Sequence, residues 1–176
     1  MSLDTLFDRF ETTTQKDLKL NFNKFFSDSQ LSPKEAGLIT LACAETTNCK
    51  ELSDFAAEHL KAQGSSAEEI AEAKDAAAIM GVMNMYYRFR SYVEKEDYKK
   101  PAGLRMNVMA RPLNGKETFE MMALAVSIIN GCHDCIKSHE ASLVKLGIAE
   151  DKIHDLARLS ATIKGLEACF RHTRAA

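Results

Sequence analysis

The chain has 176 residues, of which 45% are hydrophobic and 27% are charged, and its formal net charge is −2. This length and balance suit one globular domain with a real core and exclude a disordered chain. The small negative charge provides no positive field to attract phosphates, so we expect neither nucleic acid nor a membrane surface as a partner. We therefore treat residues 1–176 as a single domain.

The first ten residues place Asp4, Asp8 and Arg9 among apolar side chains, which is not the pattern of a secretion signal. No apolar run approaches the roughly 20 residues that a membrane span needs. We therefore expect a cytoplasmic protein. Its five cysteines are odd in number and unevenly spaced, unlike a secreted disulfide framework. In a reducing compartment, a close cysteine pair favours redox or metal chemistry over a structural role.

The composition predicts an all-α fold. Only three prolines occur, and the long stretches between them are rich in Ala, Leu, Glu, Lys and Met, which are good helix formers. Alternation of β-branched residues, the signature of strands, is nearly absent.

Helix ends can be assigned from local signals. The run Ser32-Pro33-Lys34-Glu35 combines an N-cap serine, a proline at the first helical position and a capping-box glutamate. The segment 66–69 repeats the serine-to-glutamate spacing before a long helical run. Gly64 and Gly147 stand where a glycine typically ends a helix.

The second half of the chain contains a connection and two closely spaced helices. Residues 98–113, with two prolines and a glycine, predict a connection that holds at most a short helix. One helix should follow from about Lys116 to Ile129, and another from near Cys132 to near Leu146.

A weak internal repeat relates residues 38–73 to residues 121–156. A shift of 83 positions superposes Cys49 on Cys132 and places a helix-ending glycine in both copies. The first copy lacks the chemistry of the second, because Leu52 and Ala56 stand opposite Cys135 and His139. We expect a helical bundle of two related halves, with the active site in the second.

The segment from Glu120 to His139 holds the residues that suggest chemistry. Asn130-Gly131 breaks one helix, so Cys132 falls at the N-cap of the next helix and Cys135 in its first turn. Free backbone N–H groups and the helix dipole stabilise a thiolate at such a position and lower its pKa from the usual value of about 8.5.

The spacing also allows the two thiols to react with each other. Positions i and i+3 at a helix start bring their Cα atoms to roughly 5–6 Å, which a disulfide can bridge. His139, one turn further on the same face, can exchange a proton with Cys135, and Glu120 can orient the imidazole. Cys135, His139 and Glu120 thus correspond to a nucleophile, a base and a group that orients the base.

Zinc binding is the main alternative interpretation of the same residues. Cys132, Cys135 and His139 are three possible ligands, with His133 or Glu120 as a fourth. However, no second C-x-x-C or H-x-x-x-H follows, and the ligands would crowd into two helical turns. A zinc-stabilised helical interaction module therefore remains a second hypothesis, and the favoured expectation includes no metal.

The other cysteines and the methionines receive structural interpretations. We expect Cys43, Cys49 and Cys169 to be small buried hydrophobic residues. Eight methionines, including Met80, Met83, Met85, Met121 and Met122, fall at helical spacings and are expected in the core or in subunit contacts.

The pattern Glu-x11-Cys-x2-Cys-x3-His resembles the signature of the alkyl hydroperoxidase D family (AhpD), within the carboxymuconolactone decarboxylase-like superfamily. Two further segments are similar to conserved segments of that family: residues 83–90, MNMYYRFR, and residues 104–112, LRMNVMARP. Together these resemblances extend over most of the chain from about residue 30 onward.

The resemblance implies an all-helical fold, assembly as a homotrimer, and reduction of alkyl hydroperoxides and of the peroxiredoxin AhpC. It implies that electrons come from dihydrolipoyl groups on a lipoyl carrier protein, with no tightly bound cofactor. Cys135 would form the sulfenic acid and the mixed disulfide with AhpC, and Cys132 would be the resolving thiol. Glu120 and His139 would form the proton relay.

One position departs from the family pattern. Many members have a histidine immediately before the second cysteine, whereas this chain has Asp134 there and His133 one position earlier. A carboxylate beside Cys135 opposes thiolate formation, so the relay can be weaker or arranged differently. Independently of this position, a generic disulfide reductase with negligible direct peroxidase activity is a further alternative.

Overall fold

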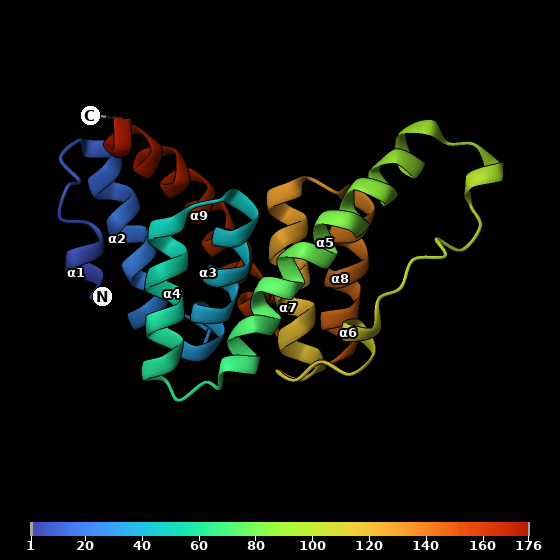
Figure 1. Cartoon of the computed structure of the whole chain (residues 1–176), viewed down its shortest axis with the longest axis horizontal. Helices are drawn as coiled ribbons and strands as arrows, with labels where there is room; N and C mark the ends of the chain where they lie inside the picture. Colours follow the sequence, from blue (N-terminus) through green and yellow to red (C-terminus); the bar gives the residue numbers. More distant parts are fainter. Residues whose placement is uncertain (1, 176) are drawn as a thin grey trace.

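The computed structural model describes residues 2–175, and within this range all regular structure is helical. The predicted all-α fold is confirmed. Positions 1 and 176 of the predicted domain lie outside the described residues. The helices in chain order are α1 (Leu3–Leu6), α2 (Thr13–Ser27), α3 (Pro33–Thr47), α4 (Lys50–Ala62), α5 (Ala67–Val93), η1 (Glu96–Tyr98), α6 (Asn107–Ala110), α7 (Lys116–Asn130), α8 (His133–Lys145) and α9 (Glu150–Ala175) (Figure 1).

The helices α3 and α5 begin with the capping boxes that the sequence predicts. The Ser32 hydroxyl accepts a hydrogen bond from the Glu35 amide, and the Glu35 carboxylate accepts one from the Ser32 amide at 2.8 Å. Ser66 and Glu69 form the same reciprocal pair at the start of α5. These bonds satisfy backbone donors that the first helical turn leaves without partners.

The centre of the bundle is α3, which packs against α4, α5, α7 and α9. Every residue of α3 from Ala36 to Ala44 is buried, because helices cover it on all sides. Two hydrophobic clusters result. One gathers α1, α2 and α9 around residues such as Phe22 and Leu159, and the other fills the space between α3, α5 and α7 around Met80 and Met122.

The outer part of α5 extends past the body of the bundle. In Figure 1 it runs diagonally across the front, and the connection after it turns back toward α6 and α7. The connection carries only the short η1 and α6, as the prolines and glycine predicted. No helix in the described part of the chain is long and apolar enough to cross a membrane.

A buried carboxylate fixes the end of this connection. Glu72 of α5 accepts hydrogen bonds from the backbone amides of Leu113 (2.6 Å) and Asn114 (2.8 Å), and one from the Asn114 side chain. Gly115, the N-cap of α7, follows directly. Glu72 therefore fixes where α7 begins relative to α5, and so helps to place the residues that α7 carries.

The helices of the two halves correspond in position along the chain. The first residues of α7, α8 and α9 lie 83 positions after those of α3, α4 and α5. Cys49 and Cys132 are both N-caps with similar backbone angles, and Leu52 and Ala56 are fully buried where the second half has Cys135 and His139. We propose that the two halves are copies of one three-helix unit within a single domain.

Candidate active site

The turn between α7 and α8 carries Cys132. Gly131 ends α7 in the left-handed conformation with φ of 65°, which glycine adopts at little cost. The backbone amide of Cys132 donates to the Ser127 carbonyl at 3.1 Å, and this bond closes the end of α7. Cys132 is then the N-cap of α8, as the sequence predicted.

Cys132 and Cys135 are joined by a disulfide, with their Cα atoms 5.3 Å apart. This separation lies in the range expected for positions i and i+3 at a helix start. Cys132 is fully buried, whereas Cys135 is 6% exposed and lines a cavity between α5, α6 and α8. A reagent that enters the cavity therefore reaches the sulfur of Cys135 before that of Cys132.

His139 and Glu120 meet across the α7–α8 contact. The Nδ1 atom of His139 lies 2.7 Å from Oε2 of Glu120, and both side chains are largely buried. Since an ionised carboxylate only accepts hydrogen bonds, Nδ1 carries the proton in this pair. His139 also lines the cavity with Cys135. The nitrogen Nε2 is consequently the one available for proton exchange there.

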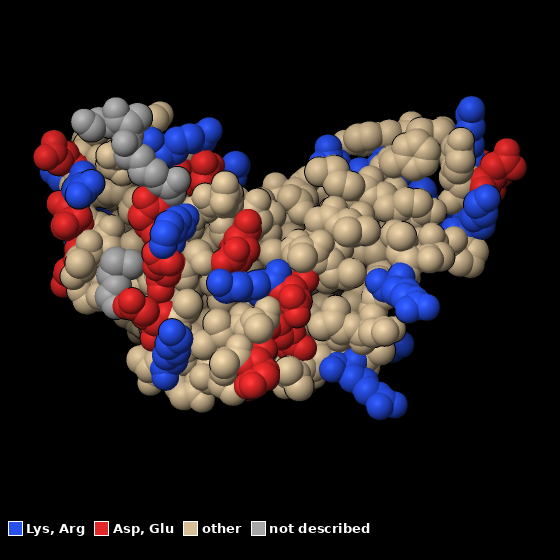
Figure 2. Space-filling model, viewed as in Figure 1, with Lys and Arg blue, Asp and Glu red and all other residues tan. Residues whose placement is uncertain are grey.

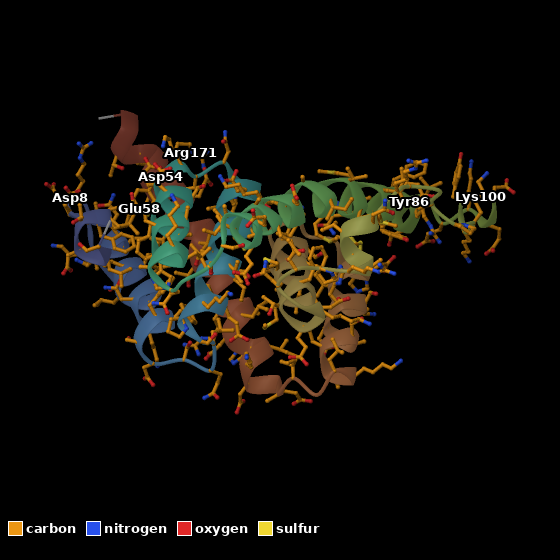
Figure 3. All side chains as sticks on the ribbon, turned by 60° about the horizontal axis from the view of Figure 1, so that its bottom comes forward. Asp8, Asp54, Glu58, Tyr86, Lys100 and Arg171 are labelled. Carbon is orange, nitrogen blue, oxygen red and sulfur yellow. A yellow bond between two sulfur atoms is a disulfide. The ribbon has the colours of Figure 1, made fainter. Side chains whose placement is uncertain are left out.

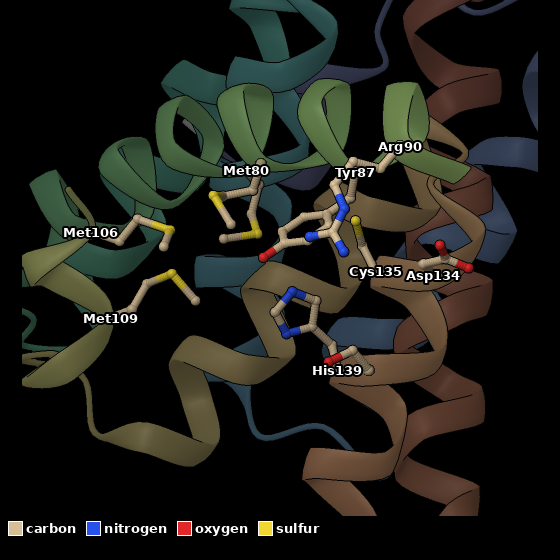
Figure 4. A pocket seen from close by; sticks show the side chains of 10 residues that line it. Met80, Tyr87, Arg90, Met106, Met109, Asp134, Cys135 and His139 are labelled. Atoms are coloured by element: carbon tan, nitrogen blue, oxygen red, sulfur yellow. The ribbon is translucent and has the colours of Figure 1, made fainter. Parts of the chain in front are cut away.

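The cavity has a volume of about 480 Å³ and lies between α5, α6 and α8. One part of its wall is apolar, formed by Met80, Met83, Met106 and Met109 (Figure 4). The other part carries polar and reactive groups from α5 and α8, namely Tyr87, Arg90, Asp134, Cys135, Ser138 and His139. The cavity can hold a ligand with an apolar portion and place its reactive group at Cys135.

The methionines named from the sequence fall in the core and the cavity, except Met85, which is 60% exposed on α5. Met121 and Met122 are fully buried core residues, as expected, and Met80 and Met83 are buried but also line the cavity. Met106 and Met109 belong to the family-like segment 104–112, but the sequence did not predict that they line a cavity. They reach the cavity because the connection brings α6 back against α5.

A chain of hydrogen-bonded polar groups, with Asn84 and Ser127 buried and Asn130 and Arg88 half-buried, lies behind Cys132. The Asn84 side chain donates to the Ser127 hydroxyl, and the Asn130 side chain donates to Asn84, both at 2.9 Å. Arg88 of α5 donates to the Asn130 carbonyl at 2.9 Å. These bonds tie α5 to the last turn of α7. Sequence reasoning missed this network, although an asparagine inside an apolar helical run was a possible signal.

His133 and Asp134 lie at the outer edge of the site. The Nδ1 atom of His133 is 3.1 Å from Oδ1 of Asp134, and both side chains are exposed. Asp134 lines the cavity opening, and His133 faces a small pocket beside Cys132. The residue that departs from the family pattern, Asp134, therefore lies beside Cys135 at the edge of the cavity.

Cys43, Cys49 and Cys169 are buried, as predicted. Burial raises the pKa of the Cys43 thiol to about 12, partly offset by a hydrogen bond to Ser160. Burial also raises the pKa of Cys169. Among the described residues, no group of three or more His, Cys, Asp or Glu side chains is placed to hold a metal ion.

Comparison with known proteins identifies the family. The model of the carboxymuconolactone decarboxylase family matches residues 13–90 and again residues 98–176. A protein of Gluconacetobacter diazotrophicus named alkyl hydroperoxide reductase AhpD is 38% identical over 96% of this chain and 92% of its own length. The chain belongs to the AhpD group of the carboxymuconolactone decarboxylase family.

Two further relatives carry the same name. An AhpD of Anaeromyxobacter dehalogenans is 38% identical over 84% of this chain and 80% of its own length. An AhpD of Coxiella burnetii is 39% identical over 86% of this chain and 87% of its own length. The resemblance inferred from the sequence motifs is therefore confirmed at the level of the family.

Proposed function

We propose that the chain is an antioxidant thiol–disulfide enzyme that reduces alkyl hydroperoxides through the Cys132–Cys135 dithiol. The observation that carries this proposal is the position of the disulfide, at a helix start, open to a cavity on the Cys135 side and one helical turn from the His139–Glu120 pair. The names of the relatives support a peroxide-related oxidoreductase role.

The oxidative half-reaction begins with the reduced protein. The Cys135 thiolate attacks the outer oxygen of the hydroperoxide, an S–O bond forms, and the O–O bond breaks. Protonated His139 supplies the proton that converts the leaving alkoxide to an alcohol. The Cys132 thiol then attacks the Cys135 sulfenic acid, which forms the disulfide and releases water.

The reductive half-reaction uses a dithiol, for which we propose the dihydrolipoyl group of a carrier protein. One of its thiolates attacks Sγ of Cys135, the more accessible sulfur, and Cys132 leaves as a thiolate at the α8 N-terminus. The second dihydrolipoyl sulfur then closes the lipoyl disulfide and releases Cys135. Two electrons and two protons pass from the donor to the protein, and no tightly bound cofactor is needed.

The same exchange chemistry can serve a protein disulfide. We propose that the peroxiredoxin AhpC is such a client, reduced through a mixed disulfide with Cys135. The name AhpD of the relatives supports this pairing. Cytoplasmic localisation is part of the proposal, because a dithiol that must be returned to its reduced form suits a reducing compartment.

We further propose that the protein assembles as a homotrimer through the outer part of α5. Val82, Met85, Phe89 and Tyr92 recur at spacings of three and four residues, so they form one stripe along the helix, and their exposed fractions lie between 46% and 75%. In Figure 2 the surface over this half of α5 is largely uncharged, whereas charged side chains crowd around α4. An apolar stripe of this kind is typical of a surface that is covered by another subunit.

One experiment tests the proposed function and separates its alternatives. Peroxide-dependent oxidation of dihydrolipoamide is measured with pure protein, with and without AhpC, for wild type and Cys135→Ser. We expect turnover that is lost in Cys135→Ser and is stimulated by AhpC. Disulfide reduction without peroxide turnover would favour a generic disulfide reductase. Near-stoichiometric zinc that is lost in Cys132→Ser would favour the zinc-stabilised interaction module and overturn the redox proposal.

A further inference from the structure

The guanidinium of Arg90 lies in the cavity, and this cation has no anionic partner in the oxidised protein. Its guanidinium lies over the ring of Tyr87, with Cζ 5.2 Å from the ring centroid, and 6.0 Å from that of Tyr86. The carboxylate that lines the cavity and the one that contacts its histidine are each engaged, Asp134 by His133 and Glu120 by His139. In the part of the chain that the structure describes, Arg90 forms no ion pair.

The charges that face Cys135 come from three helices. Arg90 extends from α5 over Tyr87 toward the side of the cavity that carries Cys135 and His139 (Figure 4). Asp134 and His139 belong to α8, and Glu120 reaches His139 from α7. The α6 side contributes only Met106 and Met109 to the wall. Arg90 is thus the one permanently charged cation among the described residues that line this cavity.

A second, polar cleft adjoins the cavity on its outer side. Arg90, Tyr87 and Asp134 line both spaces, and the cleft adds Ser91, Glu94 and Lys99. Lys99 is paired with Glu96. Arg90 therefore lies at the boundary between solvent and the sulfur of Cys135, where a positive charge is screened less than on an open surface.

We propose that the anionic partner of Arg90 is the Cys135 thiolate, which exists only when the disulfide is reduced. This inference rests on the proposed function, in which Cys135 is the reacting sulfur. In the second step of reduction, a dihydrolipoyl sulfur attacks the dihydrolipoyl sulfur of the mixed disulfide. The S–S bond to Cys135 breaks, and its electron pair goes to Sγ of Cys135. Arg90 stabilises the negative charge that develops on this sulfur.

Two physical features suit Arg90 to this role. A guanidinium stays protonated at every pH at which a thiol titrates, so its effect on Cys135 does not depend on its own ionisation. Stacking on Tyr87 holds the group in place before the charge appears. Arg90 also offsets the carboxylate of Asp134, which opposes thiolate formation at the position where many family members have a histidine.

The inference predicts changes in two equilibrium properties of the dithiol. Without Arg90 the pKa of the Cys135 thiol should rise. The redox equilibrium at neutral pH should then favour the disulfide more than it does in the parent protein. We expect a rise of about one pKa unit, which lowers the thiolate fraction by up to about tenfold at a pH below both pKa values. At a pH above both pKa values, the equilibrium with the dihydrolipoamide–lipoamide couple should instead move toward the protein disulfide by up to about tenfold.

The test compares Arg90→Gln, Arg90→Lys and the control Arg171→Gln. Arg171 is exposed, pairs with Glu167 and lies far from Tyr86 (Figure 3). Its replacement by Gln removes the same unit of positive charge as Arg90→Gln but at a distance from the cavity. The rate of Cys135 alkylation is followed from acid to mildly alkaline pH, with the modified peptide identified by mass. The redox equilibrium with dihydrolipoamide is measured on the same proteins.

We expect the Arg90→Gln profile to move to higher pH, Arg90→Lys to restore part of the shift, and Arg171→Gln to match the parent. A second variant, Tyr87→Leu, removes the stacking platform and should move the profile in the same direction by a smaller amount. Superimposable profiles and equal redox equilibria for Arg90→Gln and the parent would overturn the inference. Neither readout requires peroxide turnover, so a failure of the proposed function is recognised separately.

Discussion

Nδ1 of His139 lies 2.7 Å from Oε2 of Glu120, so the imidazole one turn after Cys135 is anchored to the preceding helix. The contact joins α7 and α8 on either side of the turn that carries Cys132. It fixes the ring orientation and directs Nδ1 to the carboxylate, which leaves Nε2 for proton exchange in the cavity. The packing of α7 against α8 therefore sets the orientation of the imidazole that is proposed to exchange protons with Cys135.

Replacement of Glu120 by Gln should lower kcat/KM for hydroperoxide by about 10²-fold, with little change in the fold. Gln has the same shape but cannot stabilise a protonated imidazole, so His139 becomes a weaker proton carrier. The pH dependence of kcat/KM should change with it. The control is Glu117→Gln, which removes an exposed carboxylate from the first turn of α7. Equal pH profiles for Glu120→Gln and wild type would remove the pair from the mechanism.

The five cysteines should differ sharply in reactivity after reduction. At neutral pH an alkylating agent should modify Cys135 first, because its sulfur lines the cavity. Cys43 should stay unmodified until the protein unfolds, because its pKa is raised to about 12 and the thiolate is the reactive form. Peptide mass analysis with and without urea measures this order. Rapid labelling of Cys43 in the folded protein would contradict the described core.

Asn84→Ala should destabilise the protein by about 1–3 kcal/mol. The change removes both hydrogen bonds that Asn84 forms and leaves the buried Ser127 hydroxyl and the half-buried Asn130 amide without their partner. Urea unfolding measures the loss, and the exposed Asn107→Ala is the matched control. A stability equal to that of wild type would mean that this network does not hold α5 against α7.

The sequence was sufficient to predict features that depend on local spacing. Capping boxes, the break at Gly131 and the N-cap position of Cys132 all depend on residues within a few positions of one another, and each is confirmed. The meeting of His139 with Glu120 also followed from the sequence, because α7 and α8 are consecutive and joined by a tight turn.

Contacts between distant segments could not be predicted in this way. Asn84 and Arg90 lie thirty or more residues before the first residue of the motif, and nothing local shows which faces of the 27-residue α5 meet α7, α8 and solvent. The methionine wall depends on the path of residues 94–106, which returns α6 to α5. Helical spacing predicted burial for Met80 and Met83 but gave no indication of the cavity beside them.

Phe89→Glu should disrupt the proposed homotrimer. A charge in the middle of the apolar stripe would have to be buried without a partner if another subunit covered it. Sedimentation velocity measures the assembly state of the variant and of wild type. The control Leu20→Glu changes an apolar side chain on α2 that is exposed as well, at 67% against 46% for Phe89. An unchanged trimer in Phe89→Glu, or a monomeric wild type, would contradict the proposed interface.

The central claim is that Cys135 is the sulfur that reacts with the hydroperoxide and Cys132 the one that resolves it. It is tested most directly by treating reduced Cys132→Ser with one equivalent of an alkyl hydroperoxide and locating the added oxygen by mass spectrometry with a sulfenic-acid probe. We predict a sulfenic acid at Cys135, whereas wild type under the same conditions forms the Cys132–Cys135 disulfide. A Cys132→Ser protein in which Cys135 remains a free thiol, while Cys135→Ser is oxidised at Cys132, would contradict the assignment.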